Sequence, residues 1–92
     1  MEMHQLRYFL AISEERNFTR AAEKSFVSQP SLSAQISKLE NELGNRLFNR
    51  LGRRVELTSA GKQFEKRARS ILMEADNAVR EIRESAVDFK GN

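Results

Sequence analysis

The sequence predicts a mainly α-helical fold, made of three short helices, a two-stranded β-hairpin and one long C-terminal helix. Three observations support this prediction. Apolar residues recur at helical spacing in the N-terminal half of the chain. An arginine-rich stretch containing one glycine separates two short extended segments. From Phe64 to Ile82, apolar residues alternate at intervals of four and three, which is the pattern of an apolar seam along one long helix.

Length and composition set the limits of the fold. Ninety-two residues with 39% hydrophobic content make one compact domain. The chain has no cysteine, which excludes disulfides and thiolate metal sites and is compatible with the cytoplasmic location that we expect. No apolar run approaches the roughly 18 residues of a membrane span, so no membrane partner is expected. The net charge of +3 is a weak indication of a polyanionic partner.

The first two helices are expected close together. The first runs from about Met3 to Glu15, where apolar residues recur on one face. Thr19 is expected to cap a short second helix from Arg20 to about Ser25. Ala21 and Ala22 make this second helix thin, so that another helix can cross it closely.

The third helix has the best-defined start. Ser28 can cap it, Pro30 falls in its first turn, and Val27 and Leu32 have the spacing of a hydrophobic staple. Gly44 is expected to end the helix at residue 43. The apolar stripe expected to be buried consists of Leu32, Ile36, Leu39 and Leu43.

Two short extended segments, about Leu47–Arg50 and Val55–Leu57, flank the sequence Leu51-Gly52-Arg53-Arg54. They predict a small β-hairpin. A two-stranded hairpin is marginal alone, so it must pack against the helices. Four arginines and no acid lie between residues 46 and 54, namely Arg46, Arg50, Arg53 and Arg54.

Thr58 is expected to cap the long helix, which runs from about Ser59 to Val87. Its apolar stripe from Phe64 to Ile82 spans about 27 Å at 1.5 Å per residue, about the diameter of a small domain. The distal half therefore lacks an intramolecular partner, and a homodimer is expected. The expected dimer residues are Phe64, Ala68, Ile71, Leu72, Ala75, Ala78, Val79 and Ile82.

The sequence shows no arrangement of side chains typical of an active site. We therefore expect no catalysis, no metal site and no cofactor in this chain. The single histidine, His4, lies near the terminus and is expected at the surface. The four glycines are scattered and form no phosphate-binding loop. The paired acids Glu14-Glu15 and Glu40/Glu42 point apart on helices, so they are expected on solvated faces.

The second and third helices, joined by the turn Phe26-Val27-Ser28, predict a helix-turn-helix, and the hairpin beside them predicts a wing. A helix that enters the major groove of DNA needs a slim, polar outward face at its N-terminal end. The residues expected at base edges are Gln29, Pro30, Ser31, Ser33 and Ala34. Gln29 can pair bidentately with adenine, whereas Pro30 and Ala34 can touch thymine methyl groups.

The backbone N–H groups at Thr19 and Ser28, at helix starts, are expected at phosphate oxygens. Arg53 and Arg54 are expected to enter a narrow minor groove. The main alternative is a protein–protein interaction module whose basic hairpin binds an acidic partner. Its helix would need large apolar anchors over residues 28–38, where small polar side chains lie instead, so DNA is favoured.

The stretch FTRAAEKSFVSQPSLSAQISKLENELGNRLFNR, followed by RRVELTSAGKQF, resembles the N-terminal domain of LysR-type transcriptional regulators of bacteria. The resemblance covers residues 3–87 and argues against another winged-helix repressor family. It implies a winged helix-turn-helix at residues 1–58 and a dimerising linker helix at 59–87. Residues 88–92 would lead to a C-terminal domain that is missing here and that binds a small-molecule effector.

The resemblance also implies roles for single residues. It implies phosphate contacts near Thr19, Ser28 and Lys38. The residues that it implies for base reading are Gln29, Pro30, Ser31, Ser33 and Ala34. The wing contact falls on Arg50, Arg53 or Arg54. Members of the family bind interrupted palindromes as dimers. For the full-length form of this protein, a tetramer and contact with RNA polymerase are further expectations. Many members of the family carry a basic residue at the position of Ala34 and a second proline at that of Ser31.

Overall fold

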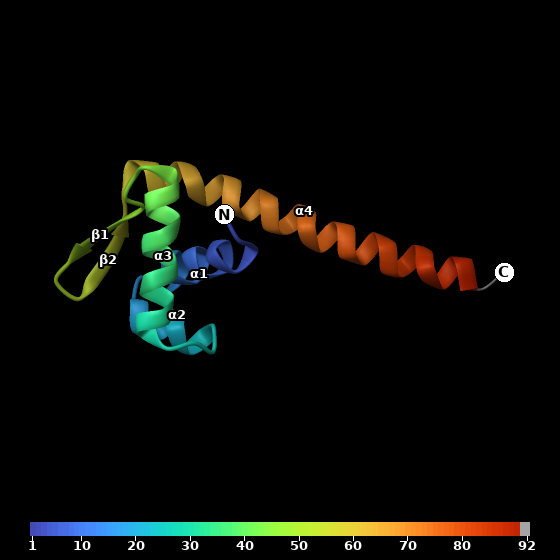
Figure 1. Ribbon diagram of the computed structural model, residues 1–92, viewed down its shortest axis with the longest axis horizontal. Coiled ribbons are helices and arrows are strands. Elements are labelled where there is room, and N and C mark those ends of the chain that lie inside the picture. The colour runs from blue at the N-terminus through green and yellow to red at the C-terminus, as the bar shows by residue number, and fades with distance from the viewer. Residues whose placement is uncertain (91–92) are drawn as a thin grey trace.

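The computed structural model describes residues 1–90, with side chains as far as Ser85. The elements in chain order are α1 (Met3–Glu15), α2 (Phe18–Lys24), α3 (Gln29–Leu43), β1 (Phe48–Leu51), β2 (Arg54–Leu57) and α4 (Ser59–Lys90). Helices α1 to α3 and the hairpin form a compact head, from which α4 extends away on the side opposite the hairpin (Figure 1). The molecule measures 59 × 25 × 19 Å. The predicted mainly α-helical fold class is confirmed.

The core of the head lies where α1 packs against α2, α3 and α4. Four phenylalanine rings form a continuous row through it. The Phe9 ring lies 5.0 Å from that of Phe64 on α4 and 5.1 Å from that of Phe48 on β1, and the Phe48 ring lies 5.9 Å from that of Phe18 on α2. Offset and edge-to-face aromatic pairs stabilise beyond the area they bury. This row therefore connects the hairpin and α2 to the base of the long helix.

Helix α2 begins earlier than predicted. Its N-cap is Asn17, whose side-chain oxygen accepts a hydrogen bond of 2.9 Å from the Arg20 N–H. Thr19, the predicted cap, lies within the first turn, and the helix ends at Lys24 rather than Ser25. The cause is the burial of Phe18, which packs into the core and moves the helix start ahead of it. The prediction of the Thr19 cap was wrong.

Helix α3 has the predicted bounds. The Ser28 Oγ accepts a hydrogen bond from the Ser31 N–H, and Pro30 lies in the first turn. Gly44 ends the helix with a φ of +69°, a left-handed conformation that glycine adopts without steric cost. Leu43 does not belong to the buried stripe as predicted: it is exposed, because no element of the head covers the last turn of α3 at that position.

The hairpin strands pair in antiparallel register, with Phe48 opposite Leu57 and Leu51 opposite Arg54. The loop consists of Gly52 and Arg53, and Gly52 has a φ of +63°. A positive φ at the first loop residue is what a type II′ turn requires, and glycine supplies it. Both strands are one residue offset from their predicted starts at 47 and 55.

Helix α4 starts where predicted and continues to Lys90. The Thr58 Oγ1 accepts a hydrogen bond of 3.0 Å from the Gly61 N–H and donates one of 2.6 Å to the Arg46 carbonyl. A Cβ at Gly61 would lie 2.1 Å from the Leu47 carbonyl oxygen, so only glycine allows this close approach. The base of α4 is thereby fixed against the segment that leads into β1.

Candidate nucleic-acid interface

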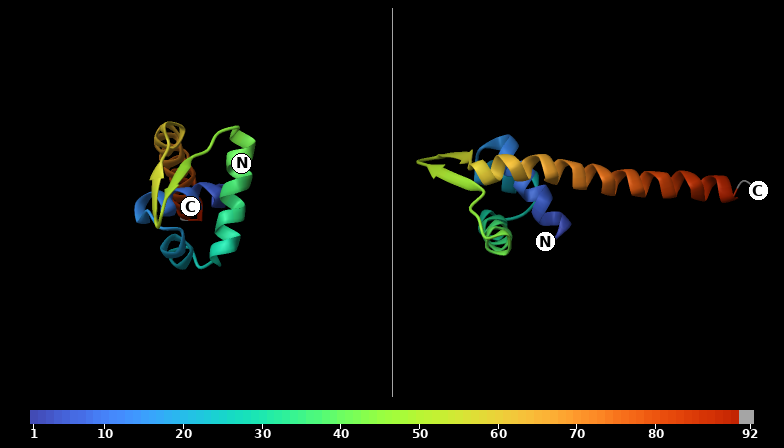
Figure 2. Two further views of the ribbon diagram at one scale, coloured as in Figure 1. Left: turned by 90° about the vertical axis from the view of Figure 1, so that its left-hand side faces the viewer. Right: turned by 90° about the horizontal axis from the view of Figure 1, so that it is seen from above.

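The N-terminal end of α3 lies beside α2, and the hairpin lies to one side of α3 (Figures 1 and 2). The starts of α2 and α3 and the hairpin border one hollow, so the three elements present one composite surface. Figure 2 shows α3 running beside the hairpin, with the start of α3 at the end that joins α2. Polar links across the head hold α3 in place. The buried Gln5 of α1 donates from its Nε2 to the Gln35 Oε1 at 3.1 Å, and the exposed His4 lies 3.2 Å from the same oxygen.

The side chains at the start of α3 are linked by hydrogen bonds. The Ser28 hydroxyl donates to the Ser31 hydroxyl at 2.8 Å, and the Gln29 Nε2 donates to the Ser33 hydroxyl at 3.0 Å. One N–H and the carbonyl oxygen of the Gln29 amide remain for a ligand. An adenine edge needs one acceptor and one donor in this arrangement. The structure therefore brings Gln29 and Ser33 together as one polar unit.

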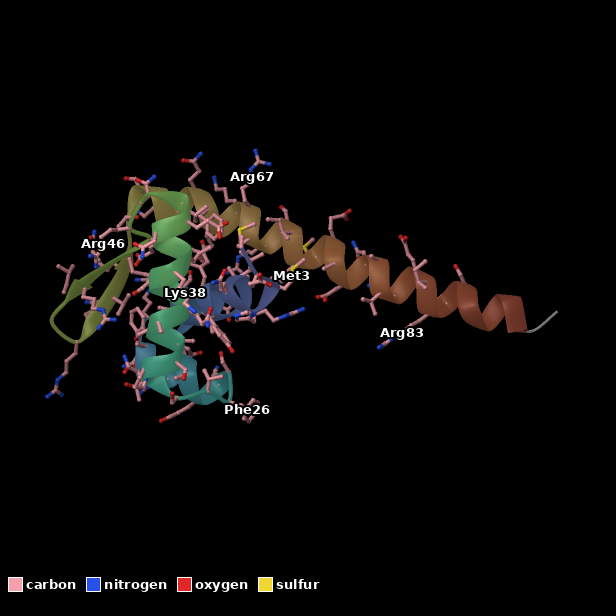
Figure 3. The ribbon with its side chains drawn as sticks, in the orientation of Figure 1. Met3, Phe26, Lys38, Arg46, Arg67 and Arg83 are labelled. Atoms are coloured by element: carbon pink, nitrogen blue, oxygen red, sulfur yellow. The ribbon has the colours of Figure 1, made fainter. Side chains whose placement is uncertain are left out.

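The outward face of α3 is slim and exposed, as predicted. It carries Pro30, Ser31, Ala34, Ser37 and Lys38, all of them exposed. Lys38 projects from the middle of the helix, and the exposed Phe26 projects from the turn that precedes it (Figure 3). Nothing in the sequence pattern indicated a role for the large side chain of Phe26. It is 94% exposed and has a φ of +58°.

The hairpin separates the wing arginines into two groups. Arg53 lies in the loop and Arg54 lies directly opposite Leu51, so both are at the tip. Arg50 lies opposite Val55 on the face of the hairpin that packs toward the helices, and its Cζ is 4.1 Å from the centre of the Phe18 ring. Arg46 precedes β1 (Figure 3). Within the part of the chain that the structure describes, these arginines form no ion pair, so their charges remain for a ligand.

Helix α4 is attached to α1 by polar contacts and by the core. Ser13 donates a hydrogen bond to the Glu65 carboxylate, and the carboxylates of Glu14 and Asp76 approach Arg69 and Arg7 at 3.5 and 3.8 Å. Of the eight predicted seam residues, the head itself buries Ala68 and Leu72. Farther along the helix, Ala78, Val79 and Ile82 are exposed, with Ile82 at 69%. An apolar surface therefore continues beyond the head.

Residues 1–85 hold no group of three or more histidine and acidic side chains that could bind a metal ion. Among the residues that the structure describes, none of the helices combines the length and the apolar character that a membrane span requires. The head, the hairpin beside α3 and the extended α4 define a winged helix-turn-helix domain with a long C-terminal helix.

Comparison with known proteins narrows this class. Residues 3–62 match the model of the bacterial regulatory helix-turn-helix proteins of the lysR family. The chain therefore belongs to the lysR family. It is 50% identical over its full length to the HTH-type transcriptional regulator BudR of Klebsiella aerogenes and 48% identical to BudR of Raoultella terrigena. It spans 64% and 32% of the lengths of these two relatives.

The structure resembles a solved complex of the BenM DNA-binding domain with catB site 1 DNA. The TM-score is 0.90 with 43% sequence identity, and the match covers 94% of this chain and 97% of the other. The winged-helix architecture and the long fourth helix thus agree with a solved member of the same class.

Proposed function

We propose that this chain is the DNA-reading part of a bacterial transcriptional regulator, and that it binds double-stranded DNA of a specific sequence as a homodimer. The observation that carries the proposal is the polar start of α3, which borders one hollow with α2 and the wing. Among the described residues, the wing arginines form no ion pair. The relatives support it: BudR is described as a transcriptional regulator, and the BenM domain was solved with DNA.

The start of α3 enters the major groove in this proposal. Gln29 reads an adenine edge with its carbonyl oxygen and remaining N–H, while Ser31 and Ser33 reach bases or phosphates. Pro30 and Ala34 supply apolar contacts for thymine methyl groups. The exposed positions of Pro30, Ser31 and Ala34 support this assignment.

Backbone contacts hold the domain in register on the duplex. Thr19, Ser28 and Lys38 are proposed at phosphates, with Arg53 and Arg54 of the wing tip in the adjacent minor groove. All five lie on α2, on α3 or its cap, or at the hairpin tip. Phosphate contacts release counterions, so binding should weaken steeply with salt.

The exposed part of the α4 seam is proposed to pair with a second copy. Val79 and Ile82 are large apolar side chains that the head leaves uncovered, and the half-buried Phe64, Ile71 and Ala75 continue the same stripe toward the head. Two paired copies present two recognition helices, so the target is an interrupted palindrome.

Because the chain spans a third of the length of one close relative, the whole protein is proposed to carry a further C-terminal domain. That domain would bind the small-molecule effector, so this chain would need no cofactor and would catalyse no reaction. Tetramer formation and contact with RNA polymerase belong to the same proposal for the whole protein, which acts in the cytoplasm.

Selection of bound sites from a pool of random DNA duplexes tests the proposal. An enriched inverted repeat is expected, with half-sites about one or two helical turns apart. Loss of that enrichment in the Gln29→Ala variant identifies α3 as the reading element. A pool that shows no enrichment with the unmodified chain would contradict sequence-specific binding, and enrichment of an isolated half-site would contradict the dimer.

A further inference from the structure

Arg50 has a different position from the other wing arginines. Side chains alternate along a strand, so Arg50 shares its face of the hairpin with the buried Phe48 and with Val55, its partner on β2. This face turns toward the helices. Arg53 lies in the loop instead, and Arg54 pairs with Leu51 one position beyond Arg50, on the other face. Arg50 is thus directed to the inner side of the wing.

The Arg50 guanidinium rests on a fixed platform. Its Cζ lies 4.1 Å from the centre of the Phe18 ring, which is only 8% exposed and contacts the Phe48 ring edge-on. A guanidinium stacked on a ring is held by the cation–π attraction and keeps its N–H donors at its edges. The stack therefore fixes the charge in space while the donors stay available for a ligand.

A hollow of about 290 Å³ lies beside this stack, between the wing and the starts of α2 and α3. Its polar side chains come from Asn17, Thr19, Gln29, Arg50 and Arg53, and no acidic residue lines it. Two positive charges and no negative one suit an anion. Gln29 belongs to this lining and is also the proposed base reader, so a strand that passes the base-reading position brings its phosphodiester groups to the same hollow.

We infer that Arg50, held by Phe18, binds a phosphodiester of the DNA backbone at this hollow with the Thr19 hydroxyl, instead of reading the minor groove with the wing tip. Phe18 is a positioning residue for this contact. The inference rests on the proposed DNA binding and adds a site to it. Entry of Arg50 into the minor groove would require the guanidinium to leave the Phe18 ring, which forfeits the cation–π attraction.

The test uses the duplex recovered by site selection and a scrambled duplex of equal length and composition. Dissociation constants are measured over a series of salt concentrations for the unmodified chain, Arg50→Ala, Phe18→Leu and the double variant. Arg50→Ala should lose affinity by a similar factor on both duplexes and should lower the slope of log affinity against log salt by about 1. Phe18→Leu should weaken binding about two- to fivefold and cause no further loss in the Arg50→Ala background.

Thermal unfolding of each variant separates loss of binding from loss of folding. Arg50 is exposed, so Arg50→Ala decides the question even if Phe18→Leu does not fold. An unchanged salt slope would overturn the inference, as would a loss confined to duplexes with A·T-rich flanks, the signature of a minor-groove reader. If Gln29→Ala weakens binding and Arg50→Ala does not, the phosphate site alone is wrong. If neither variant changes binding, the proposed function fails as well.

Discussion

The Gln29 amide donates a hydrogen bond from its Nε2 to the Ser33 hydroxyl, one helical turn away, at 3.0 Å. This bond orients the amide before DNA arrives, so its carbonyl oxygen and second N–H keep one direction. Holding a side chain in its bound orientation lowers the entropy lost on binding. We therefore predict that Ser33, besides its own reach toward the DNA, supports the proposed base reading by positioning Gln29. Its residue type and place in the sequence did not indicate this positioning role.

Replacement of Gln29 by alanine should cost roughly 1–3 kcal/mol of discrimination at one base position, since a bidentate contact to adenine is lost. Ser33→Ala should relax the preference at the same base by a smaller amount, because the amide stays but loses its support. Binding of each variant to a panel of single-base operator changes measures both effects. Ser37→Ala, on the exposed face farther along α3, is the matched control. Loss of preference at a different base in Ser33→Ala would show that Ser33 reads DNA by itself.

Replacement of Ile82 by glutamate should disrupt the dimer. Ile82 is 69% exposed, so a carboxylate at this position should hardly change the stability of the monomer. In the dimer, however, the carboxylate would be buried between two α4 helices without a partner. Met73→Glu is the control: Met73 is 64% exposed and lies nine residues away, which places it on the opposite side of the helix. Analytical ultracentrifugation should show a monomer for Ile82→Glu and a dimer for Met73→Glu. The reverse pattern would place the interface on the other face of α4.

The sequence predicted those features of the fold that depend on local chemistry. Ser28 and Gly44 bound α3 as predicted because a side-chain cap and a left-handed C-terminal residue act within one helical turn. Leu43 was predicted to be buried because it continues the apolar stripe, but periodicity does not say how far a covering element extends. Arg50 could not be separated from Arg53 by sequence, since strand register decides which face of a hairpin a side chain occupies.

The start of α2 is another feature that local sequence patterns could not predict, and it leads to a prediction about stability. Asn17 and Thr19 are both good capping residues, and the burial of Phe18 between them decides in favour of Asn17. Asn17→Ala should lower the free energy of unfolding by about 1 kcal/mol, because the Arg20 N–H loses its acceptor. Thr19→Ala should change it little while weakening DNA binding. Urea titrations of both variants measure the difference. A larger loss of stability in Thr19→Ala would restore Thr19 as the cap.

At Phe26, a substitution is expected to raise the free energy of unfolding instead of lowering it. Its side chain is 94% exposed and its φ is +58°, so it contributes almost no packing and occupies a conformation that bulky residues rarely adopt. Asparagine tolerates this left-handed conformation much better. Phe26→Asn should therefore raise the free energy of unfolding by about 0.5–1 kcal/mol, which corresponds to a rise in Tm of roughly 2–8 °C for a domain of this size. Phe26→Ala, which also removes the ring but keeps the strain, should not reproduce the gain. Equal stability of the two variants would show that the backbone at this turn carries no strain.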